Sequence, residues 1–298
     1  MRKIIVASVI AVLLAGTAWA DVNITAENFP DTEFRSYVSE TFDSDSNGIL
    51  SDAEIAEVKK LPIDADVVSG VYLMGGTFYT LSSQSNALST VHDFTGIEYF
   101  TSLEALYYEE LFRYGQQNLL EAVDLSSNTA LQYLHFCPAH LDELNLSANT
   151  ELLCVECPQI GLLSIDVSNC SNMTTLDCSS NDLTALDLSG CSAVVSLNCS
   201  GNSLASLDVS ALSRLGSLSC AQNHLARLDL VFNNYITAAD CTSQSITGSY
   251  VTHRGDAYEL DISTIIPADE LTRITELTAY DSANNAVSIT TGEGGCIV

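Results

Sequence analysis

An acidic stretch near the N-terminus has the residue types and the spacing of a cation-binding loop. The stretch DSDSNGILSDAE occupies residues 43–54, and oxygen-bearing residues recur in it at alternate positions. Alternate oxygen ligands can wrap one hard cation, and Gly48 stands where such a loop must turn sharply. The candidate metal ligands, at loop positions 1, 3, 5, 7, 9 and 12, are Asp43, Asp45, Asn47, Ile49 (through its carbonyl), Ser51 and Glu54. The pattern predicts a Ca²⁺ site.

The residues on either side of the loop predict the two helices that would hold it. Before the loop, four apolar residues share one helical face; they are Phe34, Tyr37, Val38 and Phe42. After it, SDAEIAEVKKL favours an exit helix. Loop and flanks together resemble an EF-hand, which implies Ca²⁺ as the cofactor, with Ser51 acting through water. The alternative is an acidic turn that matches by chance. Because there is one such loop, we expect a structural ion with a Kd of about 0.1 to 1 mM.

The middle of the chain repeats a unit of 21 residues without slippage. MTTLDCSSNDLTALDLSG, from residue 173, and VVSLNCSGNSLASLDVSA, from residue 194, are successive copies. Apolar residues recur at positions four, seven and fourteen, and an irregular earlier unit can be read from Leu103 to Leu125. The regular units begin at Asn128, Asn149, Cys170, Cys191, Leu212 and Asn233. No such unit can bury its apolar side alone, so neighbours must stack around a continuous core.

The third unit reads L-x-x-L-x-C-x-x-N-x-L when Met173 stands for the first leucine. This resembles the leucine-rich repeat family, and the short Cys-x-x-Asn phrases resemble repeats of its secreted bacterial members. The resemblance covers roughly residues 97–253. It implies an α/β fold, a right-handed solenoid with a parallel β-sheet on one face and mostly extended or turn structure on the other. We expect a helical EF-hand cap before it and a β-rich cap after it.

The leader sequence and the charge limit where the protein works and what it binds. MRKIIVASVIAVLLAGTAWA has a basic start, an apolar core and a small-x-small end, which predicts a signal peptide cut after Ala20. We therefore expect a secreted, extracellular or cell-surface protein, or a periplasmic one, with no transmembrane segment after cleavage. The leader holds two of the ten basic residues and none of the 38 acidic ones, so its removal changes the formal charge from −28 to −30. Phosphates would be repelled, so nucleic acid is excluded as a partner.

Composition and register divide the chain into six parts. They are a signal peptide (1–20), the EF-hand helical cap (21–62), a connecting segment with the first coil (63–100), the solenoid (101–253), a C-terminal cap (254–290) and a flexible tail (291–298). The cap is predicted from AYELDIS and NAVSIT, which alternate as strands do.

Cysteine recurs at position nine of five successive units, two residues beyond an inward leucine position. Side chains two apart on a strand share a face, so these thiols are predicted to form an inward column of small apolar groups. The column is Cys157, Cys178, Cys199, Cys220 and Cys241. Disulfides are the alternative that secretion permits. A straight column of ligands does not suit a tetrahedral metal. Cys170 and Cys191 occupy position one of adjacent units, within reach of a disulfide, and the sequence leaves open whether they are bonded.

Two polar columns have structural interpretations. The amides at position twelve, Asn181, Asn202 and Asn223, are predicted to bond to turn backbone and to the next coil. The carboxylates at position eighteen point outward and are predicted to accept backbone or serine hydrogen bonds; a cation-binding stripe is the alternative. They are Asp124, Asp166, Asp187, Asp208 and Asp229.

Function is predicted to reside on the outward strand face, because aromatic anchors gather on its first coils. The candidate partner-binding residues are Tyr107, Tyr108, Tyr133, His135, Glu156 and Asp177, near the insertion LFRYGQQN. They favour a non-enzymatic module that binds a protein or glycan partner. The alternative is a carbohydrate-active hydrolase that uses Glu156 and Asp177, which occupy position eight of adjacent coils.

Overall fold

The computed structural model describes residues 21–244, apart from 72–76, 86, 110–119, 138–139, 226–227 and 231, and six short strands between residues 251 and 297. Side chains are described over the first of these ranges except within 68–79. The predicted signal peptide (1–20) and residues 110–119 of the predicted insertion lie outside the described residues.

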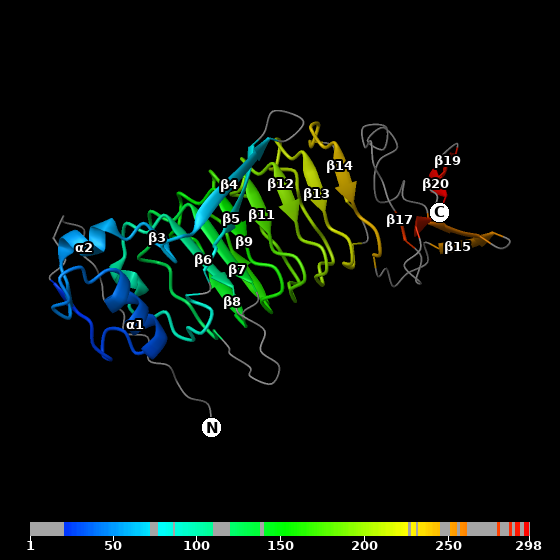
Figure 1. The fold of residues 1–298 in the computed structure, drawn as a ribbon. Coiled ribbons are helices and arrows are strands. Elements are labelled where there is room, and N and C mark those ends of the chain that lie inside the picture. The colour runs from blue at the N-terminus through cyan, green and yellow to red at the C-terminus, as the bar shows by residue number, and fades with distance from the viewer. Residues whose placement is uncertain are drawn as a thin grey trace, which may run out of the picture.

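Short parallel strands stack coil upon coil into a solenoid (Figure 1). Eight of them form one sheet in the order β14-β13-β12-β11-β9-β7-β6-β3. The sheet keeps the 21-residue register of the sequence; for example, Leu176 pairs with Leu197. The strands are β3 (Lys60–Leu61), β6 (Ala105–Glu109), β7 (Tyr133–Cys137), β9 (Cys154–Glu156), β11 (Thr175–Asp177), β12 (Ser196–Asn198), β13 (Ser217–Ser219) and β14 (Ala238–Asp240).

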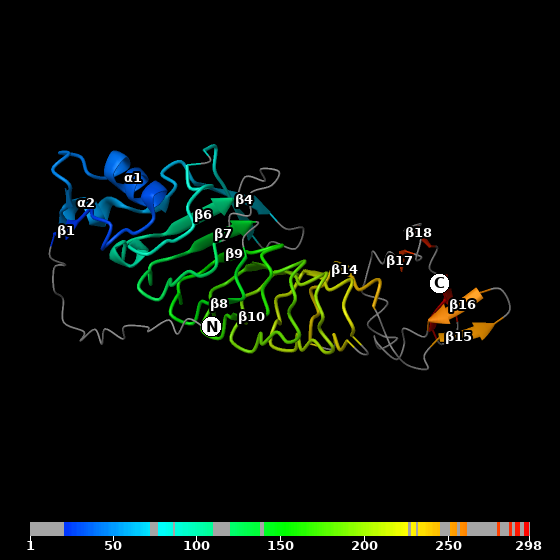
Figure 2. The same cartoon turned by 90° about the horizontal axis from the view of Figure 1, so that it is seen from below.

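The other sides of the coils are mostly extended backbone and turns, as the short unit predicts. Two strands, β8 (Glu143–Asn145) and β10 (Ser164–Asp166), pair in parallel there, away from the eight-stranded sheet (Figure 2). A 3-10 turn, η1 (Ile97–Tyr99), precedes the first coil. The apolar core of the solenoid therefore lies between the eight-stranded sheet and the extended and turn segments on the other side of the coils.

The core consists of the apolar columns that the repeat predicts. Leucines at positions seven and fourteen are buried along the stack; Leu176 and Leu183 have no exposed area. At the N-terminal end the column of cysteines gives way to aromatic rings, because Phe136 and Tyr108 occupy the same register position in β7 and β6. Their rings meet edge to face with centroids 5.9 Å apart.

The N-terminal module covers the first coil with two helices (Figure 1). Helix α1 (Thr32–Thr41) begins at Asp31, whose carboxylate accepts a hydrogen bond from the backbone N–H of Phe34 at 2.8 Å. Helix α2 (Asp52–Glu57) begins at Ser51 in a capping box with Glu54. The α1 side chain Phe34 is fully buried against Phe94, with ring centroids 5.2 Å apart. Two strands, β1 (Val22–Asn23) and β2 (Ile49–Leu50), pair antiparallel beside the helices.

An antiparallel hairpin leaves the solenoid after β3 and returns before the first coil. It consists of β4 (Asp66–Val71) and β5 (Thr77–Ser82), and it crosses the outer face of the sheet, where β5 contacts β6, β7 and β9 (Figure 1). The sequence predicts a connecting segment with the first coil over 63–100 and no hairpin, so this hairpin is a finding of the structure.

The described residues of the C-terminal part form three antiparallel strand pairs. The strands are β15 (Val251–Arg254), β16 (Ala257–Leu260), β17 (Ala279–Tyr280), β18 (Ala286–Val287), β19 (Thr290–Gly292) and β20 (Gly295–Ile297). AYELDIS and NAVSIT each contain a strand, β16 and β18. The role of these strands as a cap, and the division of the chain into six parts, stay predictions.

Candidate functional site

The acidic loop folds around its own first residue. Asp43 Oδ2 accepts a hydrogen bond from Gly48 N at 2.8 Å, and Asp43 Oδ1 accepts one from Asn47 N at 3.1 Å. Gly48 has φ +81°, in the left-handed region that glycine enters without steric cost. Asn47 Oδ1 accepts from Ile49 N at 2.7 Å. The sharp turn at loop position six is therefore present.

Three carboxylates converge inside this loop. Single oxygens of Asp43, Asp45 and Glu54 lie within 4.8 Å of one another, and Asp43 is only 7 % exposed. Within the described residues, no lysine or arginine forms an ion pair with them. Like charges held this close repel unless a cation or a proton neutralises them. The donor set consists of hard oxygens, which suits Ca²⁺ rather than a softer metal.

Glu54 closes the loop at both ends. One carboxylate oxygen accepts from the hydroxyl and the backbone N–H of Ser44, at 2.6 and 2.7 Å. The other accepts from the hydroxyl and N–H of Ser51, at 2.9 and 3.0 Å. These bonds, with the Ser44 hydroxyl first, lower the pKa of Glu54 to about 2, so the group is ionised at neutral pH.

The acidic loop is supported by β1, the first strand of the described residues, which pairs with β2 inside the loop. Val22 pairs with Leu50, Asn23 pairs with Ile49, and Ile24 N donates to Gly48 O at 2.9 Å. Loop positions seven and eight are therefore held from outside the loop. The sequence shows no second loop, and these contacts supply the support that a second loop would otherwise give.

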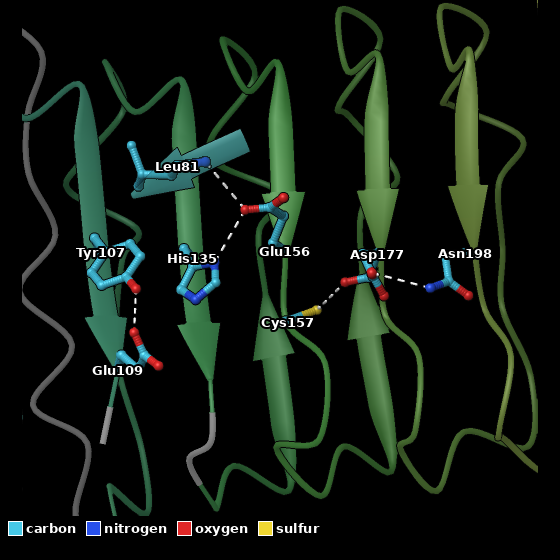
Figure 3. A network of polar contacts seen from close by, with 8 residues as sticks. All are labelled: Leu81, Tyr107, Glu109, His135, Glu156, Cys157, Asp177 and Asn198. Atoms are coloured by element: carbon cyan, nitrogen blue, oxygen red, sulfur yellow. Dashed lines mark hydrogen bonds and ion pairs between the residues drawn. The ribbon is translucent and has the colours of Figure 1, made fainter. Parts of the chain in front are cut away.

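Position eight of each coil forms a polar column on the outer face of the sheet (Figure 3). Tyr107 stacks on His135 with ring centroids 4.4 Å apart and planes 11° apart. His135 Nδ1 lies 3.1 Å from Glu156 Oε2. Further along, Asn198 Nδ2 donates to Asp177 Oδ2 at 3.1 Å. The column continues through Ser219 and Asp240 in the same register.

The hairpin β4–β5 is attached to this column through Glu156. The backbone N–H of Leu81 donates to Glu156 Oε2 at 3.2 Å, the oxygen that also contacts His135 (Figure 3). Around this bond lies a small apolar cluster that is separate from the main core. Its members are Ala65, Leu81 and Ala105, with Val67, Tyr107 and Tyr133 partly buried against them.

Five of the six predicted partner-binding residues share the outer face. Tyr107, Tyr133, His135, Glu156 and Asp177 all occupy outward positions of neighbouring strands. The hairpin packs against part of them, so this patch is less open than the sequence suggests. The side chains of His135 and Glu156 are 17 % and 15 % exposed.

The sixth prediction, Tyr108, is wrong. Tyr108 is fully buried at the inward position nine, and its hydroxyl donates to Val91 O at 3.1 Å. Leu106 and Tyr108 lie two apart and therefore point the same way. That alternation could have identified Tyr108 as a core residue. Conversely, Glu109 was missed; its carboxylate accepts a hydrogen bond from the Tyr107 hydroxyl on the outer face.

Glu156 and Asp177, the pair of the hydrolase alternative, are neighbours in register. Both carboxylates are engaged in hydrogen bonds. Asp177 Oδ1 accepts from the Ser179 hydroxyl at 2.6 Å and from Ser179 N at 3.0 Å, while Oδ2 accepts from Asn198. These bonds fix both oxygens of the Asp177 carboxylate in place.

The cysteine column lies in the core, as predicted. Cys157, Cys178, Cys199 and Cys220 are fully buried, and Cys241 at the end of the column is partly buried. The nine cysteines from Cys137 to Cys241 form no disulfide in the structure. Burial raises the pKa of the Cys178 thiol well above its ordinary value, which opposes thiolate chemistry there.

The second cysteine pair, Cys170 and Cys191, occupies position one of the unit, where most other units have asparagine. Asn149 Nδ2 donates to Asn128 O and Leu125 O of the preceding coil, at 2.9 and 3.0 Å. Cys191 Sγ points in the same direction and lies 3.4 Å from Val167 O, as a thiol donor would. The thiols of Cys170 and Cys191 thus take the place that asparagine has elsewhere.

The two polar columns are structural, as predicted. Asn202 Nδ2 donates to the carbonyls of Cys178 and Cys199, both at 3.0 Å, and its Oδ1 accepts from Leu183 N at 3.0 Å. At position eighteen, Asp187 Oδ1 accepts from Ser189 N at 2.9 Å. The same bond recurs at Asp124, Asp166 and Asp208.

Comparison with known proteins shows the fold. No known family profile and no curated protein matches the sequence. Among solved structures, an internalin (inlF) from Listeria monocytogenes is similar with a TM-score of 0.57 and 16 % identity, covering 88 % of this chain and 67 % of that one. The fold of this chain is therefore a leucine-rich repeat solenoid.

Two further structures are more distant. The functional domain of InlJ from Listeria monocytogenes, which includes a cysteine ladder, has a TM-score of 0.37 and 20 % identity over 88 % of this chain and 62 % of that one. A leucine-rich repeat protein of Leptospira interrogans has a TM-score of 0.48 and 16 % identity over 62 % of this chain and 44 % of that one.

In the part of the chain that the structure describes, no helix has the length and apolarity needed to span a bilayer.

Proposed function

We propose that this protein is a secreted or surface-displayed interaction module that binds a protein partner through the outward face of its parallel sheet. The observation that supports this most directly is the position-eight column, a continuous polar strip that crosses strands β6 to β14. A broad strip of this kind suits a macromolecular partner, whereas small molecules favour enclosed apolar pockets.

The coils beyond the hairpin offer the most open part of this face. Ser196 and Ser217 at position six, and Asn198, Ser219 and Asp240 at position eight, are all partly exposed. Their hydroxyl, amide and carboxylate groups can exchange hydrogen bonds with a partner. The formal charge of −28 favours a basic partner surface and steers its approach.

Paired variants test the face. We would place arginine at Ser196 and Ser217, which are neighbours in register on the outer face. The matched control places arginine at Ser164 and Ser206, which are exposed at position sixteen on another side of the coil. Each full-length variant is immobilised and used to capture proteins from the surface fraction of the source cells, with quantification by mass spectrometry.

A partner that the wild type and the control capture, and that Ser196→Arg/Ser217→Arg loses about tenfold or more, supports the proposal; tenfold corresponds to the removal of one interface anchor. Equal capture by both pairs of variants would place binding elsewhere. Capture that is absent while the wild type binds members of a carbohydrate array would favour the glycan alternative.

We also propose that the loop 43–54 binds one Ca²⁺, which stabilises the N-terminal module. The three converging carboxylates of Asp43, Asp45 and Glu54 support this, because their mutual repulsion is relieved by a divalent cation. Asn47, Ile49 and Ser51 would complete the shell, the last through water. When bound, the ion joins the loop to α2, and α2 leads directly into β3 at the edge of the sheet.

A thermal melt with and without Ca²⁺ tests this second proposal. At 10 mM Ca²⁺ and a Kd of about 0.1 to 1 mM, mass action adds about 1.4 to 2.7 kcal/mol, a rise in Tm of several degrees. Glu54→Gln should abolish the rise. Asp52→Asn removes the same charge at an exposed residue that is not a candidate ligand, and it should retain the rise. A wild-type melt that Ca²⁺ and EGTA leave unchanged would reject the site.

A further inference from the structure

We infer that the hairpin β4–β5 is a displaceable cover that occludes the first coils of the strand face and is latched there by Glu156. This rests on the proposed function, because it concerns the regulation of the same partner surface. The inference follows from what the hairpin buries, from how weakly it is attached and from which residues lie under it.

The first observation is the burial of Cys154. This residue pairs in register with Tyr133 and Thr175 at position six, where side chains point outward. Cys154 nevertheless has no exposed area, and Thr175 in the next coil is 8 % exposed, whereas Ser196 and Ser217 at the same position of β12 and β13 are partly exposed. Because successive coils repeat the same geometry, we attribute the complete burial of Cys154 to β5, which contacts β9 from outside.

The second observation is the attachment of the hairpin. Its apolar contact with the sheet is a cluster with three fully packed residues, Ala65, Leu81 and Ala105, and this cluster is separate from the main core. A hairpin of two strands is marginally stable by itself. Small clusters apart from the main core open locally at a lower free energy than the whole domain. The hairpin can therefore open while the solenoid stays folded.

The base of the hairpin is held independently of the face. Asp64 Oδ1 accepts from the hydroxyls of Ser83 and Ser85, both at 2.8 Å, and Lys60 pairs with Asp66 at 3.2 Å. These bonds join the two ends of the hairpin to each other and to β3. Opening at the face would therefore swing the strands about a fixed base.

The third observation is what the cover occludes. Under and beside it lie the stacked rings of Tyr107 and His135, together with Tyr133. Aromatic side chains of this kind dominate the energetics of protein interfaces. The later coils carry small side chains on this face and no aromatic ring in β12, β13 or β14. The cover thus hides the part of the face with the greatest capacity to bind.

Glu156 is the latch because one of its oxygens accepts from the hairpin backbone at Leu81 and also contacts His135. The neighbouring carboxylate, Asp177, accepts hydrogen bonds from Ser179 and Asn198, and among the described residues it makes none to the hairpin. Glu156 and Asp177 are thus a matched pair, alike in charge and in place on the face, of which one holds the hairpin.

Thiol labelling of the native full-length chain tests the inference without any partner. Cys154 is followed by N-ethylmaleimide labelling and peptide mass spectrometry, with partly exposed Cys137 as the open reference and core Cys178 as the reference for global unfolding. We expect Cys154 to label more slowly than Cys137 in the wild type. Glu156→Ala should raise its rate about tenfold or more, as the loss of a charge-assisted hydrogen bond allows, with Cys178 unchanged.

Two variants separate opening from electrostatics, because the carboxylates of Glu156 and Asp177 both raise the pKa of the Cys154 thiol. Asp177→Ala removes one such charge but leaves the latch, so it should raise the rate less than Glu156→Ala. Leu81→Ala weakens the apolar contact without changing any charge, and it should also raise the rate. Labelling of Cys154 in Glu156→Ala and Leu81→Ala that is no faster than in Asp177→Ala would overturn the inference.

The partner-capture assay described above then tests whether the hairpin blocks binding to the strand face. Leu81→Ala should capture more of the partner than the wild type does, while Ser196→Arg/Ser217→Arg still loses it. Faster labelling with no gain in capture would show that the cover opens but does not regulate binding, which overturns the occlusion and leaves strand-face binding intact. Loss of strand-face binding itself would be seen in the arginine variants and not in the labelling.

Discussion

Replacing Asn202 by alanine should remove a substantial part of the stability of the solenoid. Asn202 is 7 % exposed, and its Oδ1 is the acceptor for Leu183 N at 3.0 Å. Its Nδ2 bonds the carbonyls of Cys178 and Cys199 across two coils, at 3.0 Å each. In Asn202→Ala, Leu183 N loses its acceptor in a buried place.

The loss of stability in Asn202→Ala depends on which hydrogen bonds each of these backbone groups keeps. Cys178 O and Cys199 O keep bonds from Asn181 and Asn223, so each loses about 0.5 to 1 kcal/mol. The buried Leu183 N–H keeps no such bond and costs about 1 to 3 kcal/mol. We therefore expect Asn202→Ala to lower the free energy of unfolding by about 3 kcal/mol.

Urea denaturation followed by circular dichroism measures this loss. The control is Asn172→Ala, the same change at an exposed residue that makes one bond of 3.5 Å to Thr150 O. It should cost less than about 0.5 kcal/mol. If both variants shift the midpoint equally at an unchanged slope, the asparagine column does not connect the coils as argued.

Three further outcomes follow. Tyr108→Ala should lower the free energy of unfolding by about 3 to 5 kcal/mol in the same assay, because Tyr108 is fully buried; a variant of wild-type stability would return the side chain to the surface. Glu54 has its folded pKa lowered from 4.5 to about 2, so the stability that it contributes is present above about pH 4.5 and is lost as pH falls towards 2. Melts without Ca²⁺ over this range should show that loss, and Glu54→Gln should flatten it. Burial raises the thiol pKa of Cys178, so at pH 8 Ellman's reagent should leave native Cys178 unmodified and react with partly exposed Cys241; modification of both at one rate would refute the buried column.

Much of the fold was predictable because the repeat is local. Each repeat unit contacts mainly its neighbours, so side chains 21 residues apart are expected to stack on one another. The inward position of Cys178, the amide bonds of Asn202 and the outward bond of Asp187 all follow from period and alternation. Tyr108 obeys the same alternation, but the irregular first unit obscures it, so the sequence alone suggests a surface position for this aromatic side chain.

The acidic loop 43–54 was also recognisable in the sequence, since its candidate ligands lie within twelve consecutive residues. Its strand partner was not, because β1 carries no pattern that links Val22 to Leu50. That contact depends on where the helices place the two segments. The convergence of Asp43, Asp45 and Glu54 likewise becomes a distance only in three dimensions.

By itself the sequence determined the stack: the register of the coils, the buried column of thiols and the outward polar columns. Only the tertiary structure decided that β4–β5 lies across the first coils and that Glu156 holds it. The bond from Leu81 to Glu156 joins residues 75 apart in the chain, once, with no repetition. A contact that recurs in every coil produces a periodic pattern of residues in the sequence, whereas a single contact between distant segments produces no local pattern.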